Sequence, residues 1–136
     1  MTLDTSAVVA ILRDEVEKSE FLSLVDGAAR NQISTVSLLE LTMVLEGKKD
    51  RNGEYLLDQF VRMAGIIAVP FDQDQLRIAR SAFRRYGKGR HKAGLNFGDC
   101  AAYALSQWSG EPLLYKGNDF AATDVSSARN FGLHER

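Results

Sequence analysis

The sequence predicts a single α/β domain in which a mainly parallel sheet lies between two layers of helices. Short apolar or β-branched runs alternate with longer helix-like segments throughout the 136 residues. Strands separated by helices pair in parallel, because each parallel pair needs a long crossover connection. The one Asn-Gly hairpin signal, Asn52-Gly53, lies between two helix-like segments rather than between strands. We therefore expect a three-layer α/β/α sandwich formed by residues 1–136.

Four segments are expected to form the sheet. The second is rich in β-branched residues, and the third is an apolar run short enough for a buried parallel strand. The expected strands are 2–4, 32–36, 66–70 and 112–115, with a short additional strand at 124–125.

Six segments are expected to be helical. In residues 72–86 apolar side chains recur every three or four positions, which is the spacing of one helix face. We expect Thr5 or Ser6 to cap the first helix, Ser37 to open the third and Asn96 to cap the sixth. A polar turn is expected at 48–52 and a loosely held tail at the C-terminus. The expected helices are 6–12, 16–29, 37–47, 53–64, 72–86 and 97–108.

Composition excludes several classes of protein. Cys100 is the only cysteine, so an intrachain disulfide, a paired-cysteine zinc site and a C-x-x-C redox motif are excluded. No apolar stretch approaches the roughly 18 residues that a membrane span needs. The N-terminus lacks the basic start and long apolar centre of a signal peptide. We expect a cytoplasmic protein that does not enter membranes.

Charge is unevenly distributed, although the net charge is only −1. The segment from Gln75 to Gly98 contains no acidic residue and is strongly basic. A solvated helix flank followed by a loop is one interpretation of such a run. Its position just before Asp99 favours the other interpretation, phosphate binding. The candidate RNA-binding residues are Arg84, Arg85, Lys88, Arg90 and Lys92.

Four acidic residues, Asp4, Glu40, Asp99 and Asp119, lie where a strand is expected to give way to a helix or turn. In a parallel sheet these junctions share one edge, so we expect the four carboxylates to meet there. Carboxylates about 5 Å apart repel by roughly 3 kcal/mol per pair at an effective dielectric near 20. A fold that collects them therefore needs a counter-charge. Oxygen ligands without a His or Cys cluster favour Mg²⁺ or Mn²⁺, which suits phosphodiester hydrolysis.

Each acid also has a purely structural interpretation. Asp4 is a possible helix cap and Asp119 a possible turn residue. Glu40 and Asp99 each stand three residues after a possible cap, as in a capping box, at Ser37 and Asn96. Glu40 fits this interpretation least well. It lies among apolar residues, so we expect its carboxylate to be partly buried and to need a partner.

Four segments resemble the PIN domain and, more narrowly, the VapC toxins of bacterial VapBC toxin–antitoxin systems. They are Leu3-Asp4-Thr5-Ser6-Ala7 and residues 34–41, 95–104 and 113–120, which together span nearly the whole chain.

The resemblance implies roles for individual residues. Asp4, Glu40, Asp99 and Asp119 match the catalytic quartet that holds Mg²⁺ or Mn²⁺, with Asp4 and Asp99 as direct ligands and the other two acting through water. Thr5 and Ser6 match hydroxyl positions that orient the site. Asn118 either hydrogen-bonds a substrate phosphate or shapes its turn, and Asp124 is peripheral.

The implied activity is endonucleolytic hydrolysis of RNA that leaves a 5′-phosphate and a 3′-hydroxyl. The resemblance also implies a homodimer and a VapB-type antitoxin that places a basic residue in the acidic pocket, with the apolar helices between 16 and 64 as candidate contact surfaces. A non-catalytic PIN-like module that binds RNA or protein is the alternative. A haloacid-dehalogenase-like phosphotransferase is disfavoured, because it needs an acid at the position of Ser6.

Overall fold

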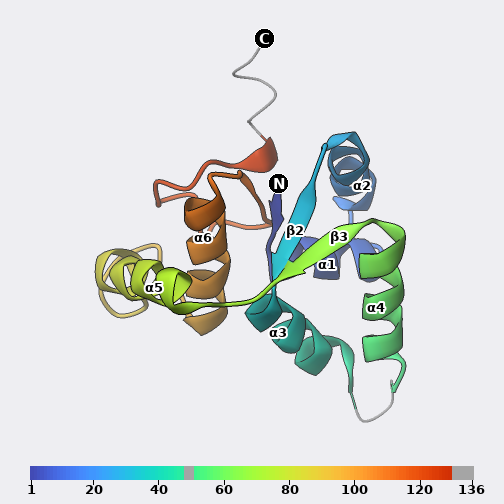
Figure 1. Cartoon of the computed structure of the whole chain (residues 1–136), viewed down its shortest axis with the longest axis horizontal. Helices are drawn as coiled ribbons and strands as arrows, with labels where there is room; N and C mark the ends of the chain where they lie inside the picture. Colours follow the sequence, from blue (N-terminus) through green and yellow to red (C-terminus); the bar gives the residue numbers. More distant parts are fainter. Residues whose placement is uncertain (48–50, 130–136) are drawn as a thin grey trace.

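The computed structural model describes residues 1–47 and 51–129, which form a four-stranded, all-parallel sheet with helices on both sides (Figure 1). The strand order is β3-β2-β1-β4, so the first strand lies inside the sheet and pairs with both the second and the fourth. The predicted parallel sheet is confirmed. Its strands are β1 (Thr2–Leu3), β2 (Asn31–Ser34), β3 (Ile66–Val69) and β4 (Leu113–Leu114).

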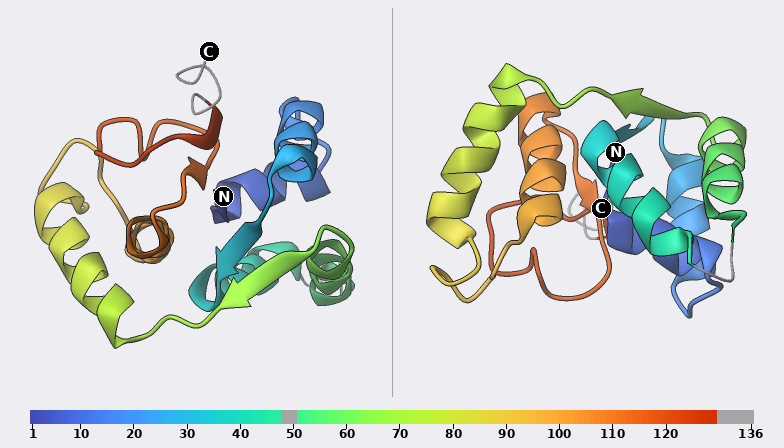
Figure 2. Two further views of the ribbon diagram at one scale, coloured as in Figure 1. Left: turned by 45° about the horizontal axis from the view of Figure 1, so that its top comes forward. Right: turned by 90° about the horizontal axis from the view of Figure 1, so that it is seen from below.

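Helices cover both faces of this sheet, as predicted. In Figure 2 (left), α5 and α6 lie on one side of the strands, and α1, α2 and α4 lie on the other. The described residues form six helices: α1 (Thr5–Leu12), α2 (Lys18–Gly27), α3 (Thr35–Leu45), α4 (Gly53–Met63), α5 (Gln73–Tyr86) and α6 (Phe97–Ser109).

Each face of the sheet has its own apolar core. Ile33 packs with Phe21 and Leu57 on the side of α1, α2 and α4. Leu113 packs with Phe120 and the small residues of α6 on the other side. The strands β1, β2 and β4 are buried throughout and need no polar–apolar alternation, whereas Ile67 and Ala68 of β3 are exposed. No described helix is long and apolar enough to cross a membrane.

Two helices begin earlier than the sequence analysis predicted. The third starts at Thr35, and its N-cap is Ser34, whose Oγ accepts a hydrogen bond from the Val36 backbone N–H at 3.1 Å. Thr35 and Val36, assigned by prediction to the strand, instead form the first helical turn. The first helix is capped by Asp4, so the prediction of Thr5 or Ser6 as its cap was wrong.

The segment after β4 also differs from the prediction. Residues 124–125 do not form a strand, and the nearest pairing is a single bridge between Leu113 and Ser127. There the Leu113 N–H donates to the Ser126 carbonyl at 2.8 Å. Part of the predicted turn at 48–52 and most of the predicted loose tail lie outside the described residues.

Candidate active site

Asp4 lies at the junction between β1 and α1 and performs two backbone tasks. Its N–H donates to the Leu114 carbonyl at 2.9 Å, and its Oδ2 accepts from the Ser6 N–H at 3.0 Å and from Ser6 Oγ at 2.6 Å. Ser6 Oγ in turn accepts from the Lys116 N–H at 2.9 Å. The Ser6 hydroxyl therefore fixes the Asp4 carboxylate and ties it to the chain that leaves β4.

Glu40 lies in the middle of α3 and is half-buried. Because α3 starts at Thr35, the predicted capping box between Ser37 and Glu40 does not form. Glu40 Oε1 instead accepts a hydrogen bond from Thr5 Oγ1 at 2.6 Å. Its carboxylate rests against Gly98 in the first turn of α6, where an added Cβ would lie 2.4 to 2.7 Å from the carboxylate atoms. A glycine at this position gives Glu40 room beside the positive end of α6.

Asp99 is buried in the first turn of α6 and closes the predicted capping box. Its N–H donates to Asn96 Oδ1 at 2.9 Å, and its Oδ2 accepts from the Asn96 N–H at 3.1 Å. Asp119, by contrast, is exposed in the turn that follows β4. Its neighbour Asn118 is also exposed and shapes that turn, because its carbonyl accepts from the Ala121 N–H at 3.1 Å.

Electrostatics connects the four carboxylates. The pKa of Asp4 is raised to about 6, mainly by burial and also by the negative charge of Glu40, against the opposing hydrogen bonds from Ser6 and the Thr5 backbone. Burial likewise raises the pKa of Asp99 to about 7, and Asp4, Asp119 and Glu40 all add to this rise. The charges of Asp4, Glu40 and Asp119 therefore all act on Asp99, and within the described chain none of the four acids forms an ion pair with a basic side chain.

The four carboxylates are the kind of ligand that a hard cation prefers, although their side chains are not arranged around a common metal position. Across residues 1–47 and 51–129, no group of three or more His, Cys, Asp or Glu side chains is arranged to hold a metal ion. Three of the acids keep a carboxylate oxygen for which no hydrogen bond from a described residue is found: Oδ1 of Asp99, Oε2 of Glu40, and both oxygens of Asp119. The Asp4 carboxylate is held by Ser6 and by the Thr5 backbone. Oxygen donors with uncompensated negative charge are what Mg²⁺ and Mn²⁺ bind.

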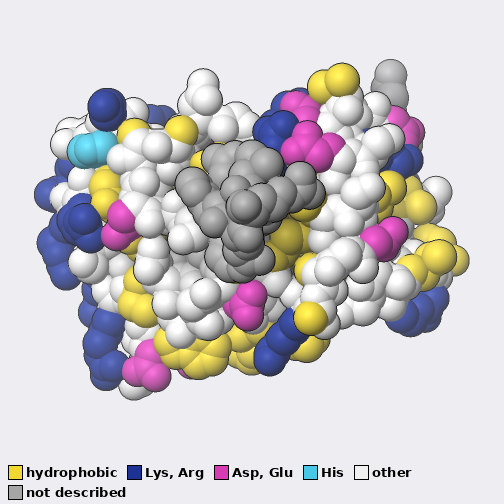
Figure 3. Space-filling view, turned by 90° about the horizontal axis from the view of Figure 1, so that it is seen from above, with side chains coloured by type: hydrophobic (Ala, Val, Ile, Leu, Met, Phe, Trp, Pro, Cys, Tyr) yellow, Lys and Arg dark blue, Asp and Glu magenta, His cyan; other side chains and the backbone are white. Residues whose placement is uncertain are grey.

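Of the five predicted RNA-binding residues, two line a groove and three do not. Figure 3 shows Lys and Arg side chains gathered on the side of the molecule where α5 and its following loop lie. Arg84 and Lys88 line a groove of about 600 Å³ between α5, α6 and the start of α3, and the same groove reaches Asn96. Arg90 instead lies over the Phe83 ring at 5.0 Å, and Lys92 is exposed in the loop.

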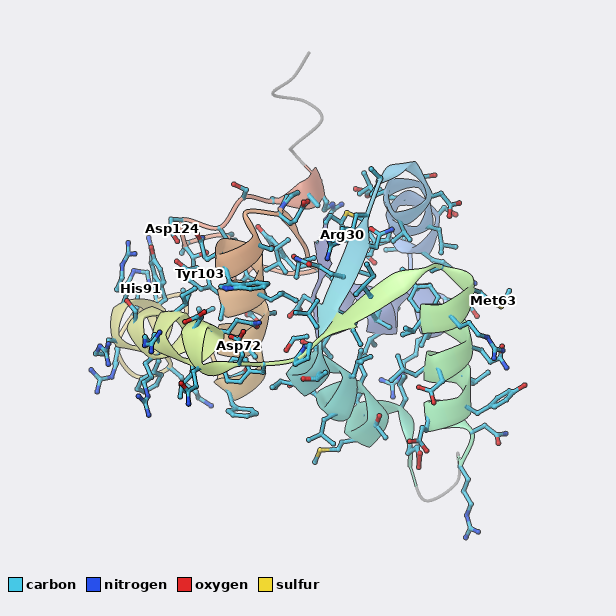
Figure 4. The ribbon with its side chains drawn as sticks, in the orientation of Figure 1. Arg30, Met63, Asp72, His91, Tyr103 and Asp124 are labelled. Carbon is cyan, nitrogen blue, oxygen red and sulfur yellow. The ribbon has the colours of Figure 1, made fainter. Side chains whose placement is uncertain are left out.

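Arg85, although predicted with this group, points to a different neighbourhood. It forms an ion pair with Asp124 at 3.7 Å and donates to the Tyr86 hydroxyl at 2.9 Å. Asp124, in the segment after β4, also accepts from the Tyr103 hydroxyl of α6 at 2.5 Å, and the two residues lie near each other in Figure 4. Asp124 is therefore engaged by Tyr103 and Arg85.

Sequence reasoning missed two residues beside the acids. Gly98 lies within one of the segments that resemble the PIN domain, but no role was predicted for it. Its role depends on contact with Glu40, which is 58 positions away in the sequence. Phe97, which begins α6, is 82% exposed and lines the groove between α5 and α6. An aromatic residue at the first helical position beside a candidate catalytic acid was a signal that the sequence offered.

Comparisons with known proteins agree with this geometry. The PIN domain family model matches residues 1–126. The chain is 47% identical over 131 residues to the ribonuclease VapC of Mycolicibacterium smegmatis, covering 93% of this chain and 98% of the relative. Its fold is similar to that of Mycobacterium tuberculosis VapC20, described as a sarcin–ricin loop cleaving toxin, with a TM-score of 0.72, 16% identity, and coverage of 91% and 95%. It is also similar to a chain of the VapBC2 structure from Rickettsia felis bound to a promoter DNA fragment, with a TM-score of 0.70, 18% identity, and coverage of 93% and 94%.

Proposed function

Since the chain belongs to the PIN-domain family, as a close relative of the VapC ribonucleases, we propose that it is the toxin of a VapBC system and cleaves RNA as a Mg²⁺- or Mn²⁺-dependent endoribonuclease. The observation that carries the metal dependence is the set of four mutually repelling carboxylates without a basic partner among the described residues. Such a set raises the free energy of the folded protein unless a cation compensates it. This loss of stability is explained if the bound cation takes part in catalysis.

Asp4 and Asp99 are the proposed direct ligands, with Glu40 and Asp119 completing the negative site. When bound, Mg²⁺ or Mn²⁺ would activate a water molecule and neutralise charge on the scissile phosphate. The protein's own contribution is to hold the ligands still. Ser6 and Asn96 fix Oδ2 of the two aspartates, so the caps do not use Oδ1 of either residue.

Thr5 and Gly98 perform the corresponding task for Glu40. The Thr5 hydroxyl fixes one carboxylate oxygen, and Gly98 leaves the space that the carboxylate fills. Groups that orient ligands without touching the metal commonly affect metal affinity or activity 10- to 100-fold. We assign Thr5 and Gly98 such a positioning role.

Binding of RNA needs cations close to this negative site, because the acids alone would repel the phosphate backbone. Arg84 and Lys88 supply them along the groove that ends at Asn96. Arg90 and Lys92 extend the positive surface into the loop, whereas Arg85 is occupied by Asp124. We expect these residues to position the strand rather than to select its sequence.

The proposed partners are a VapB-type antitoxin and a second copy of the chain. Support for the antitoxin comes from the VapC relatives and from the Rickettsia felis VapBC2 structure, one chain of which has a fold similar to this one. Exposed apolar side chains on α3 and α4 offer contact surface for a protein partner, notably Leu39, Met43, Leu56 and Met63.

The first test is cleavage of total RNA by the purified protein with Mg²⁺ or Mn²⁺, beside an EDTA control and an Asp4→Asn, Asp99→Asn double variant. We expect discrete, metal-dependent fragments that the double variant does not produce. Each of the two asparagines preserves a side-chain oxygen for its helix cap, so circular dichroism should show that the double variant is folded. Absence of cleavage by folded, antitoxin-free protein would instead favour the non-catalytic binding module.

A further inference from the structure

We propose that the groove between α5 and α6 binds an unpaired nucleotide of the RNA, and that Phe97 is the platform on which its base stacks. This inference rests on the proposed function, because it specifies how the RNA meets the site. It assigns a binding groove for the nucleotide and a residue that contacts its base.

The groove has the composition of a nucleotide-binding surface. Its floor is apolar and consists of buried side chains, including Ala79, Leu95 and Cys100. Its rim carries three exposed cations, Arg80, Arg84 and Lys88, none of which forms an ion pair with a described acid. Proteins that bind single strands combine a cationic track for the backbone with aromatic or apolar surfaces for the bases.

Phe97 is the least buried aromatic ring at this groove. It is 82% exposed, and no aromatic ring or cation of the described residues stacks on it. Phe83, in contrast, is 42% exposed and has Arg90 over its ring. The open Phe97 ring contributes little to the core, and each nucleobase offers it a π-face of suitable size.

The position of Phe97 connects base binding to the chemistry. It is the first residue of α6, directly after Asn96 and two residues before Asp99. Asn96 lines the groove and also shares two hydrogen bonds with Asp99. Residues two apart in a helix point about 200° apart, so Phe97 lies on the groove side of α6 and Asp99 on another side. Asn96, which lines the groove and bonds to Asp99, therefore links a nucleotide held on Phe97 to the proposed metal ligands.

Charge favours RNA over a protein as the occupant. The chain from Gln75 to Gly98 contains no acid that could pair with an incoming basic residue, and the rim presents cations that suit phosphate.

Two backbone contacts hold Lys88 at the end of the groove. The Lys88 N–H donates to the Leu95 carbonyl at 3.0 Å, and Gly87 passes so close to Phe83 that its added Cβ would lie 2.4 Å from a ring carbon.

The experiment compares Phe97→Ala, Phe97→Trp and Trp108→Ala, each in the Asp99→Asn background, which prevents cleavage during the measurement. Trp108 is a matched control, because it is a 47% exposed aromatic residue on the same helix that does not line the groove. Fluorescence anisotropy measures binding of a labelled single-stranded RNA oligonucleotide and of the same sequence as a duplex. We expect Phe97→Ala to raise the Kd for the single strand at least tenfold, or about 1.4 kcal/mol. Phe97→Trp and Trp108→Ala should stay within threefold, and the effect on the duplex should be smaller.

Equal single-strand affinity of the Phe97→Ala and Trp108→Ala variants would overturn the inference, as would failure of the Asp99→Asn protein to bind the single strand. The inference would also be overturned if Phe97→Ala lost self-association, or binding to a VapB-type C-terminal peptide, while its RNA affinity stayed unchanged. That result would assign the groove to a protein partner. In the otherwise unmodified protein, Phe97→Ala should raise KM for cleavage while leaving kcat within threefold. Failure of the proposed function appears separately, as absence of metal-dependent cleavage by the unmodified protein.

Discussion

Replacing Gly98 by alanine should damage the site while leaving the fold intact. The added Cβ would lie 2.4 Å from Glu40 Oε2, 2.6 Å from Oε1 and 2.7 Å from Cδ. Because comfortable carbon contacts begin near 3.5 Å, the carboxylate must move by about 1 Å. It is the far end of a flexible side chain, so it moves more easily than the helix backbone. Its hydrogen bond with Thr5 Oγ1, now 2.6 Å, would be broken or badly bent.

The expected change in the free energy of unfolding is small. Alanine is favoured over glycine within a helix by about 1 kcal/mol, whereas loss of a hydrogen bond to a charged acceptor costs about 1.5–3 kcal/mol. The net loss is about 1 kcal/mol, or a decrease in Tm of about 4 °C for a domain of this size. Activity should fall much more, because a misplacement of about 1 Å in a catalytic group costs about 10²-fold in rate.

Cleavage rates at saturating Mn²⁺ and thermal unfolding of the same preparations test this prediction. Gly27→Ala is the matched control, because Gly27 also lies in a helix and an added Cβ there meets nothing within 4 Å. Gly27→Ala should retain full activity. A folded Gly98→Ala protein with unchanged activity and Mn²⁺ affinity would refute the assignment of Glu40 to the site.

Three further predictions concern the acids and their partners. In metal-free protein the free energy of unfolding should decrease as pH rises from about 4 to 7 and then level off. The folded-state pKa values of Asp4 and Asp99, about 6 and about 7, exceed their ordinary value of 3.8, so the folded state binds more protons than the unfolded state in this window. At 1.36 kcal/mol per pKa unit the full loss is roughly 3 kcal/mol for Asp4 and 4 kcal/mol for Asp99. Urea unfolding at pH 4.5 and pH 8 measures most of this loss, and a flat profile would contradict the burial argument. Thr5→Val should reduce the cleavage rate about tenfold, because Glu40 loses its hydrogen bond, whereas Thr5→Ser should preserve the rate. Equal cleavage rates of the two variants would show that the Thr5 hydroxyl has no role in the site. Asp124→Asn should cost about 1–2 kcal/mol of stability through Tyr103 but leave the Mn²⁺-induced increase in Tm unchanged, and loss of that increase in calorimetry would place Asp124 among the metal-binding acids.

The order of elements and the positions of the acids could be predicted because they depend on local pattern and simple topology. A parallel sheet needs short strands separated by helices, and this fold places Asp4 at the start of α1 and Asp99 in the first turn of α6. The start of α3 could not be predicted in the same way. Ser34 and Ser37 are both good caps, and the choice of Ser34 depends on where β2 stops pairing with β3. This shift moved Glu40 out of the first helical turn.

The division of the basic segment also needed the third dimension. Arg84 and Arg85 are adjacent in sequence, yet successive helical residues point about 100° apart, so they serve different surfaces. Arg84 faces the groove, whereas Arg85 meets Asp124 from the C-terminal segment. Such long-range pairing leaves no periodic trace in the sequence. Composition therefore indicated a phosphate-binding segment without indicating which of its cations are available.

The structural and chemical interpretations of Asp4 and Asp99 are compatible, because they use different oxygens. In both residues Oδ2 holds a helix start, through Ser6 in α1 and through Asn96 in α6, while the second oxygen, Oδ1, is not used by these caps. A carboxylate held by its cap loses little further rotamer freedom when it binds a cation, so the cap lowers the entropic cost of binding. The capping interactions that made each acid ambiguous in the sequence are thus what would preorganise it as a ligand.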